Sequence, residues 1–245
     1  MISIIVVCFN SAKTIKRSIE SIIGQDNQDY EIIFIDGGST DGTLDIIASY
    51  EVPKSVYSEK DEGIYDAMNK GLSVANGEYL LYLNSDDYFT DSSALGYIQK
   101  ACVKGPDFIF GDIRYALGEK ILRRWCSDIS RVSILNAASH IPHASLTVKK
   151  SIMQKLNGFD TKFDFAADFD LIFRLLNITA NYVYIPQELV EMAHGGKTSS
   201  GVSSWYRQQL EIYQILTRKH SIRHYEFLFF ILERFQFKIK QHFYK

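Results

Sequence analysis

Three short, mainly apolar runs, the first of them largely β-branched, most constrain the fold of this chain. They cover residues 2–9, 30–36 and 78–84. Strands that are buried on both faces have this composition, because helices cover both sides of their sheet. Helix-like patterns over residues 11–23 and 43–50 lie between the runs. Strands that alternate with helices predict βαβ units and a mostly parallel α/β sheet.

The rest of the chain continues this pattern less regularly. Residues 107–110 predict one more strand, and the stretch IRYALGEKILRRW predicts a hairpin that turns near Leu117. We expect a helix directly after Lys149 and another that ends near Leu176. The chain of 245 residues is long enough for one large domain, or for one domain with a small appendage.

Composition narrows the class of protein. Hydrophobic content of 46% and charged content of 23% are typical of a globular chain with a core. The three cysteines, Cys8, Cys102 and Cys126, are odd in number and have no CxxC spacing, so we expect neither a disulfide framework nor a zinc site. The first residues lack the basic leader of a signal peptide, and no apolar run is long enough to span a bilayer.

Carboxylates gather where predicted strands end. Asp36 closes the second apolar run, Asp86 and Asp87 follow the third, and Asp61 begins a turn before the helical pattern IYDAMNKGL. In open parallel sheets, ligands bind outside the carboxyl ends of the strands. Asp61 is equally well explained as a turn or cap residue. Two adjacent carboxylates after a buried strand instead suit a hard divalent cation, which takes oxygen ligands.

The stretch FDFAADFDLIFRLL offers candidates for a general base. Its apolar residues form one helical stripe, and Asp168 and Asp170 fall on opposite flanks of it. Asp170 precedes Arg174 by four residues, which predicts an ordinary surface ion pair. Asp168 has no such partner, so it is the better candidate, and capping of the helix is its structural alternative.

Five segments, SIIVVCFN, IDGGSTDGT, EKDEGIYDAMNKG, LNSDD and GFDTKFDFAADFDL, occur in the order and spacing of family 2 glycosyltransferases. The chain resembles that family, whose fold is the GT-A fold, from Ile2 to about Ser203. The segments IDGGST and GIYDAMNKG most resemble its bacterial surface-polysaccharide subgroup, which includes enzymes of O-antigen, capsule and colanic-acid assembly. The resemblance implies inverting sugar transfer from a nucleotide-sugar, often a UDP-sugar, with a divalent cation, Mn or Mg.

The resemblance also implies roles for particular residues. Donor-binding roles fall on five positions: Asn10, Asp36, Asp61, Asn84 and Asp86. NSDD stands in place of the family's DxD motif, with Asn84 where the motif usually has Asp, so Asp86 is the expected metal ligand and Asp87 the second. Asp168 takes the position of the base in the ED motif, where Ala167 replaces the usual first acid. We also note His143, His194 and Lys197, the last two in a glycine-containing loop that is able to close over phosphates.

These expectations divide the chain. We predict a glycosyltransferase domain over residues 1–205, with a nucleotide-sugar-binding half to residue 112, an acceptor-side half from residue 113, and a helical tail over residues 206–245. The acceptor is expected to be a glycan or a lipid-linked saccharide. The predicted location is the cytoplasm, including the inner face of the plasma membrane as a peripheral protein.

The C-terminal tail carries an uneven charge. Residues 207–245 have eight Lys or Arg against three Glu, while the whole chain has a net charge of −2. From residue 225 onward, aromatic side chains mix with these cations. Either the tail packs on the domain as a helix, or it binds an anionic membrane surface. Nucleic acid is not an expected partner, because the acidic remainder of the chain would repel phosphates.

Two other classes of protein compete with a glycosyltransferase. Sugar-nucleotide pyrophosphorylases place a glycine-rich loop with Arg or Lys after the first strand, where this chain has CFNSAKT, which argues against that class. A binding module that has lost its chemistry would have no need of Asp86, Asp87 and Asp168, whereas Asn84 and Ala167 are compatible with it. Transfer or donor hydrolysis in the presence of metal separates an enzyme from such a module.

Overall fold

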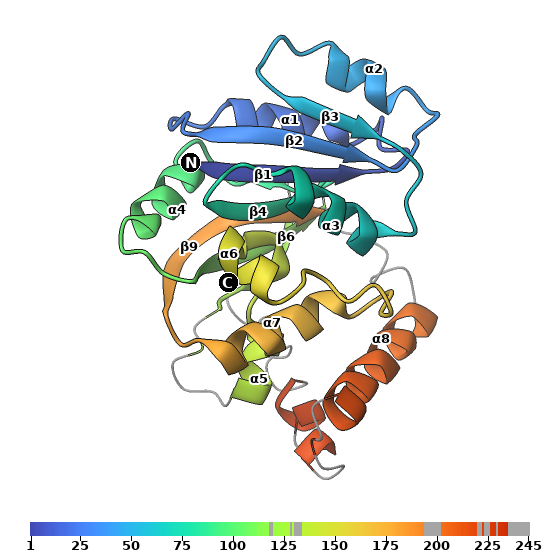
Figure 1. Cartoon of the computed structure of the whole chain (residues 1–245), viewed down its shortest axis with the longest axis vertical. Coiled ribbons are helices and arrows are strands. Elements are labelled where there is room, and N and C mark those ends of the chain that lie inside the picture. Colours follow the sequence, from blue (N-terminus) through green and yellow to red (C-terminus); the bar gives the residue numbers. More distant parts are fainter. Residues whose placement is uncertain are drawn as a thin grey trace.

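A computed structural model describes residues 1–117, 120–127, 129, 134–193, 202–219, 222, 226–228 and 230–234. It confirms the α/β arrangement, with helices on both sides of one curved sheet (Figure 1). The N-terminal half contains β1 (Ile2–Cys8), α1 (Ile15–Ile23), β2 (Tyr30–Asp36), α2 (Thr43–Ala48), β3 (Ser55–Ser58), α3 (Ile64–Val74), β4 (Tyr79–Asn84), β5 (Tyr88–Phe89) and α4 (Ala94–Cys102).

The second half completes the sheet. It contains β6 (Phe108–Leu117), β7 (Lys120–Trp125), α5 (Ile134–His140), the short 3₁₀ helix η1 (His143–Ser145), β8 (Thr147–Lys149), α6 (Lys150–Lys155), α7 (Ala167–Ile178), β9 (Tyr182–Ala193), α8 (Val202–Gln214) and the π-helical η3 (Ile215–Lys219). The predicted hairpin is present as β6 and β7, which pair antiparallel.

The strand order explains where ligands can enter. The sheet runs β3-β2-β1-β4-β8-β6-β9-β5, and β7 pairs with β6 outside this path. The first four strands are parallel, so β1, β2 and β4 end at one edge. The short strand β8 is antiparallel to both neighbours, β4 and β6. The parallel run therefore stops beside β4, and the acidic loop after β4 lies at that boundary.

The core has two layers because β1 is buried on both faces. Ile5 and Val7 pack in a cluster with residues of α3, α5 and α7, whereas Ile4 and Val6 pack with residues of α1 and α4. This alternation is the period-two geometry of a strand. It explains why the run is continuously apolar, as the sequence predicted.

The C-terminal segment packs against the first of these clusters. Residues 226–228 and 230–234 are helical, and Phe230 is 1% exposed with its ring centroid 5.7 Å from that of Phe169 in α7. Leu228 and Leu232 remain exposed. Figure 1 shows α8 and this segment at the end of the molecule opposite α2 and β3. The described part of the tail thus follows the packed-helix alternative.

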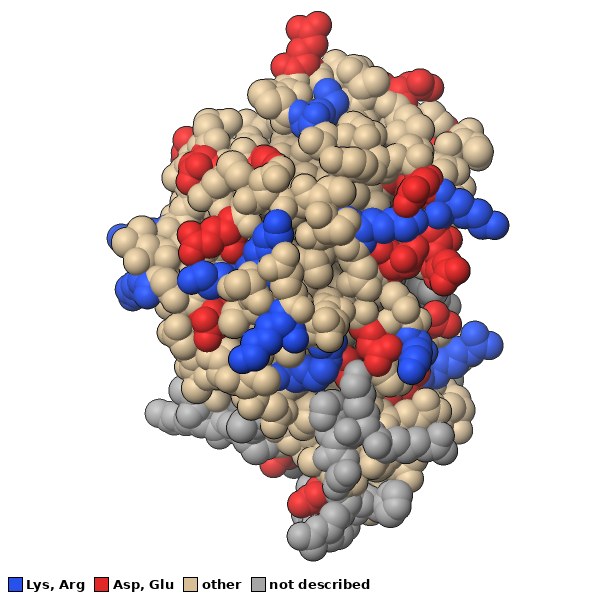
Figure 2. Space-filling model, in the orientation of Figure 1, with Lys and Arg blue, Asp and Glu red and all other residues tan. Residues whose placement is uncertain are grey.

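The face of the molecule drawn in Figure 2 has no patch of one charge among the described residues. In the view of Figure 2, acidic and basic side chains of the described residues are interspersed. No helix within the described residues is both long and apolar enough to cross a membrane. The feature that does stand out is a deep cavity at the edge where the parallel strands end.

Candidate active site

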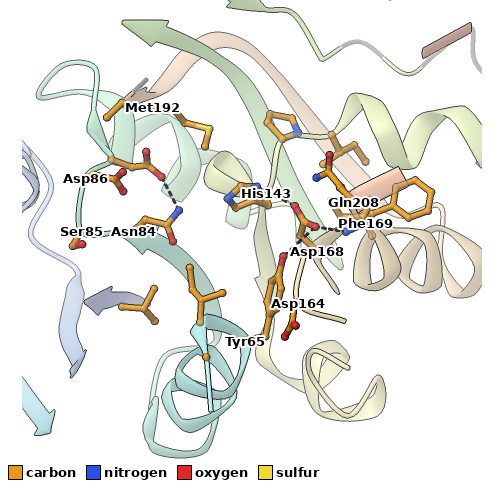
Figure 3. Close-up of a pocket in the computed structure, with 18 of the residues that line it drawn as sticks. Tyr65, Asn84, Ser85, Asp86, His143, Asp164, Asp168, Phe169, Met192 and Gln208 are labelled. Carbon is orange, nitrogen blue, oxygen red and sulfur yellow. Dashed lines mark hydrogen bonds and ion pairs between the residues drawn. The ribbon is translucent and has the colours of Figure 1, made fainter. Parts of the chain in front are cut away.

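One cavity of about 960 Å³ brings together the two halves of the chain. The ends of β1 and β4 and the start of α3 line one side, including Phe9, Asp61 and Asp86. His143 of η1 and Asp168 of α7 line the other. Figure 3 shows His143 between the β4 loop, with Asn84 and Asp86, and the start of α7, with Asp168. The predicted donor residues Asp61, Asn84 and Asp86 therefore share one space with Asp168, whereas the predicted Asn10 and Asp36 are not among the residues that line it.

The loop after β4 holds two carboxylates of different exposure. Asp86 is half-buried, whereas Asp87 is only 2% exposed and accepts a 3.0 Å hydrogen bond from Asn84 Nδ2. Burial, together with the charge of Asp86, raises the pKa of Asp87 to about 7. Burial also raises the pKa of Asp86. Both carboxyl groups are therefore harder to ionise than an exposed Asp, and a nearby positive charge would favour their ionised forms.

The residues of this loop fit a divalent cation that is shared with a ligand. The oxygen Oδ1 of Asn84 is buried and has no hydrogen-bond partner in the described part of the chain. That part contains no cluster of three or more acidic, histidine or cysteine side chains arranged to hold a metal. Asp86 and Asp87 thus offer an incomplete oxygen shell, and Mg²⁺ in particular is often held by one or two carboxylates plus substrate phosphates.

Asp168 is the centre of a small polar network. Its Oδ2 lies 3.3 Å from His143 Nδ1, and its Oδ1 accepts hydrogen bonds from Tyr65 Oη at 3.3 Å and from the Phe169 backbone N–H at 2.8 Å. Burial alone would raise the pKa of Asp168, but His143, together with the hydrogen bonds from Phe169 and Tyr65, outweighs it and the net shift is downward. Asp168 is therefore ionised at neutral pH and faces the cavity.

The same contact also shifts the pKa of the His143 imidazole. Burial alone would lower the pKa of His143, but the hydrogen bond and charge of Asp168 outweigh it, and the net shift is upward. Asp168 is not the N-cap residue of α7, which is Ala166, but it accepts a hydrogen bond from the Phe169 backbone N–H in the first turn, so part of the predicted structural alternative is present. The carboxylate also contacts His143 and Tyr65, which come from other elements.

The predicted ion pair between Asp170 and Arg174 is present, but it is buried and does not lie at the surface. Asp170 is 0% exposed, and its Oδ2 accepts a 2.7 Å hydrogen bond from Arg174 Nε. Arg174 also donates to the carbonyl oxygens of Leu156 and Gly158. The pair is buried because the loop before α7 folds over it. Asp170 and Arg174 therefore anchor that loop, which leaves Asp168 as the carboxylate of this helix that reaches the cavity.

Asp36 holds together the turn that follows β2. It is 0% exposed, and its Oδ2 accepts hydrogen bonds from the backbone N–H groups of Gly38 and Ser39 and from Ser58 Oγ. Burial would raise its pKa, but these hydrogen bonds outweigh it and the net shift is downward. A role toward the nucleoside stays a prediction. Such a role would have to act through the turn or compete with these donors.

Asn10 and Asp61 lie beside the same turn. Asn10 has a φ of 49°, and its Oδ1 accepts from the Thr40 backbone N–H. Asp61 Oδ1 accepts from the Gly63 backbone N–H at 2.9 Å, which is the predicted turn geometry. A Cβ at Gly37 would lie 2.5 Å from Asp61 Oδ2. The glycine at position 37 therefore leaves room for Asp61 to reach the cavity.

Several residues that line the cavity were not identified from the sequence. They come from separate elements and are Tyr65, Arg123, Asp164, Trp205, Gln208 and Arg234. None of them stands at a strand end or in a carboxylate pair, so local patterns do not mark them. The predicted residues His194 and Lys197 lie outside the described residues, and their roles stay predictions.

Comparison with known proteins identifies the family of this chain. The model of the family "Glycosyl transferase family 2" matches residues 3–174. The PGL/p-HBAD biosynthesis glycosyltransferase of Mycobacterium bovis is 27% identical over 201 residues, which cover 76% of this chain and 74% of that protein.

Two solved structures share the fold. They are S. aureus TarS 1-349 in complex with UDP-GlcNAc, with a TM-score of 0.70 and 18% identity, and the Pyrobaculum calidifontis mannosyltransferase PcManGT in complex with GDP-Man and Mn²⁺, with a TM-score of 0.69 and 19% identity. They cover 88% and 91% of this chain, but only 66% and 64% of the solved chains.

The chain belongs to glycosyltransferase family 2, because the family model matches more than half of its length. It is a glycosyltransferase with the GT-A fold that the sequence motifs predicted.

Proposed function

We propose that this glycosyltransferase moves a sugar from a nucleotide-sugar, most simply a UDP-sugar, to a hydroxyl of a glycan or lipid-linked saccharide, with inversion at the anomeric carbon. The observation that carries this proposal is the shared cavity, which places Asp86 and Asp168 on opposite sides of His143. One carboxylate lies where parallel strands end, and the other lies at the start of α7.

The two carboxylates would have separate tasks. Asp86, with Asp87 behind it, would hold a divalent cation, which neutralises the charge that develops on the leaving diphosphate. Asp168 would accept the proton of the acceptor hydroxyl while that oxygen forms its bond to the anomeric carbon. The bond from this carbon to the diphosphate oxygen breaks, and the nucleoside diphosphate leaves with the electron pair.

The relatives support the donor class. TarS binds UDP and UDP-GlcNAc in its solved complexes, and PcManGT binds GDP-Man with Mn²⁺. The mycobacterial relative is named for the biosynthesis of PGL/p-HBAD, and a Borreliella burgdorferi relative, 42% identical over 89 residues, is named a cholesterol galactosyltransferase. Acceptors in these names differ widely, so for this chain a surface-polysaccharide acceptor remains our proposal from the motifs.

A donor panel tests this function directly. UDP-, GDP- and dTDP-sugars are titrated with Mn²⁺ or Mg²⁺ and again with EDTA, and release of the nucleoside diphosphate is followed. We expect one nucleotide class to bind and turn over only with metal. Asp86→Ala should abolish the metal-dependent part of donor binding without unfolding the protein. Glu51→Ala, which removes an exposed carboxylate, is the matched control.

Two results would contradict the proposal in different ways. Full activity of the wild type in EDTA, or of Asp86→Ala with metal, would remove the metal role. Donor binding with neither hydrolysis nor transfer to any glycan tested would favour the alternative of a nucleotide-sugar-binding module.

Peripheral attachment to an anionic membrane is a separate part of the proposal. Phe230 lies in the core, so we assign this contact to residues 235–245, which lie outside the described residues and carry Lys238, Lys240 and Lys245. Each cation near such a surface contributes on the order of 1 kcal/mol. Deletion of residues 235–245 should lower co-sedimentation with vesicles that contain phosphatidylserine. Equal sedimentation of both proteins would rule out this attachment.

A further inference from the structure

The C-terminal segment contributes a cation to the active-site cavity. Phe230 is buried against Phe169, the neighbour of Asp168, and Arg234 follows one helical turn later. Arg234 lines the cavity, together with Trp205 and Gln208 of α8. The tail therefore forms part of the wall on the side of the proposed base.

The guanidinium of Arg234 retains most of its binding capacity. Its Nη1 donates a 3.1 Å hydrogen bond to Gln209 Oε1, and its Cζ lies 6.0 Å from the centre of the Phe230 ring. Within the described ranges, no carboxylate forms an ion pair with it. A guanidinium has five N–H donors in a planar fork that matches carboxylate and phosphate groups. Removing such a charge from water without an anionic partner is costly.

The charge of Arg234 is retained at neutral pH. Burial lowers its pKa to about 10, and the negative charge of Asp168 acts in the opposite direction. Arg234 lies on the side of the proposed base, because Phe230, one helical turn before it, packs on Phe169 beside Asp168.

A second guanidinium also lines the cavity. Arg123 of β7 lines the same cavity, and its Cζ lies 4.2 Å from the ring centre of Tyr115 and 5.3 Å from that of Trp125. Tyr115, Trp125 and Trp205 all line the cavity. Aromatic rings beside guanidinium groups offer an apolar face for a sugar ring and a cation for a charged substituent.

We propose that the acceptor carries an oxyanion, a phosphate or a uronic acid carboxylate, and that Arg234 binds it. This inference rests on the proposed function, because it assigns the substrate class of the same cavity. It accounts for a guanidinium that lies beside the base and has no anionic partner in the described structure.

Binding of matched small glycosides tests the proposal. The protein is saturated with UDP and Mn²⁺, so that the donor site is filled, and calorimetry compares three derivatives of each of several hexoses. The derivatives are the neutral methyl glycoside, the methyl glycosiduronic acid and the glycosyl 1-phosphate. We expect at least one charged derivative to bind about tenfold or more tightly than its neutral partner, as hydrogen bonds to a charged group predict. The better of the two charged series identifies the anion as carboxylate or phosphate.

Variants test whether Arg234 causes the preference for charged over neutral derivatives. In Arg234→Gln, the affinity for the charged derivative should fall to within a few-fold of that for the neutral one. Arg234→Lys should retain part of the preference, because lysine keeps the charge but lacks the planar guanidinium. Arg207→Gln, which removes an exposed cation of α8, should leave it unchanged. Melting temperatures verify that each variant is folded. If Arg234→Gln unfolds, the comparison of Arg234→Lys with the wild type tests the proposal.

Three outcomes would overturn the inference. They are equal binding of charged and neutral derivatives by the wild type, an undiminished preference in Arg234→Gln, and a loss of UDP affinity in that variant as large as its loss of glycoside affinity. The last would assign Arg234 to the donor. A wild type that binds no nucleoside diphosphate at all would instead refute the proposed function, and this is measured before any glycoside is added.

Discussion

His143 Nδ1 of η1 lies 3.3 Å from Asp168 Oδ2 of α7, although the two residues are 25 positions apart in the chain. Each shifts the other toward its charged form, so that the pKa of Asp168 falls and that of His143 rises. The proposed base is thus held ionised by a neighbour that also faces the acidic pair after β4. His143 is the residue through which the two ends of the site influence each other.

Removing the imidazole should change how transfer depends on pH. In His143→Gln, Asp168 loses the partner that keeps its pKa low, so its pKa should rise. A protonated Asp168 is unable to accept a proton, and the acidic limb of the kcat/KM profile should therefore move to higher pH. Tyr65→Phe removes a neutral hydrogen-bond donor from the same carboxylate and should move the limb less, in the same direction. An acidic limb that stays in place in His143→Gln would show that the pair does not set it.

Asp87 predicts a second pH effect, on stability. Its folded pKa of about 7 lies above the value of 3.8 for an unperturbed Asp, so the folded state binds the extra proton between these values. Stability should therefore fall as pH rises through this window. At about 1.4 kcal/mol per pKa unit, the loss between pH 5 and pH 8 is on the order of 2–3 kcal/mol.

Urea unfolding in EDTA at the two pH values measures this loss. Asp87→Asn lacks the titrating group and should lose less stability than the wild type over the same interval. Glu51→Gln, at an exposed position, serves as the control. If wild type and Asp87→Asn lost equal stability, the shifted titration of Asp87 would be excluded.

Asp36 should contribute to the stability of the fold as well as to binding of the nucleoside. Asp36→Asn keeps the volume but replaces an acceptor oxygen with a donor, which faces the N–H and O–H donors of the turn. A buried donor without an acceptor costs about 1–3 kcal/mol, so the melting temperature should fall. Affinity for UDP should fall as much as affinity for the UDP-sugar, because the sugar lies away from this turn in our proposal. Unchanged UDP affinity with a collapse of turnover would contradict the nucleoside role.

The strands that the sequence predicted are those whose pattern reflects burial on both faces. The runs that became β1, β2 and β4 are continuously apolar for this reason. The strand β9 was not predicted, because Pro186 and the polar residues Gln187 and Glu188 interrupt its pattern, and its register with β6 shifts at Gly111 and Asp112. The edge strand β3 was missed because all four of its residues are exposed.

The residues of the candidate site also divide into those that the sequence predicted and those that it did not. Asp86, Asp87 and Asp168 were identified because carboxylates after a buried strand or beside an apolar helical stripe are unusual enough to need an explanation. Tyr65 and Arg234 reach the cavity only through the packing of α3 and of the C-terminal segment, which no local pattern encodes. The tail cations looked alike in the sequence, and the burial of Phe230 is what positions Arg234 at the cavity.

The most direct test of the account is the effect of Asp168→Asn on transfer and on donor binding, measured on the same preparation. The substitution keeps the shape of the side chain and removes the proton acceptor. General-base catalysis is typically worth about 10²–10⁴-fold, so transfer should fall by this factor, whereas affinity for the nucleotide-sugar and the metal should hardly change. Asp170→Asn, which alters the buried pair with Arg174, should lower the melting temperature and serves as the structural comparison. Transfer by Asp168→Asn within a few-fold of the wild type, with an unchanged melting temperature, would contradict the assignment of Asp168 as the base.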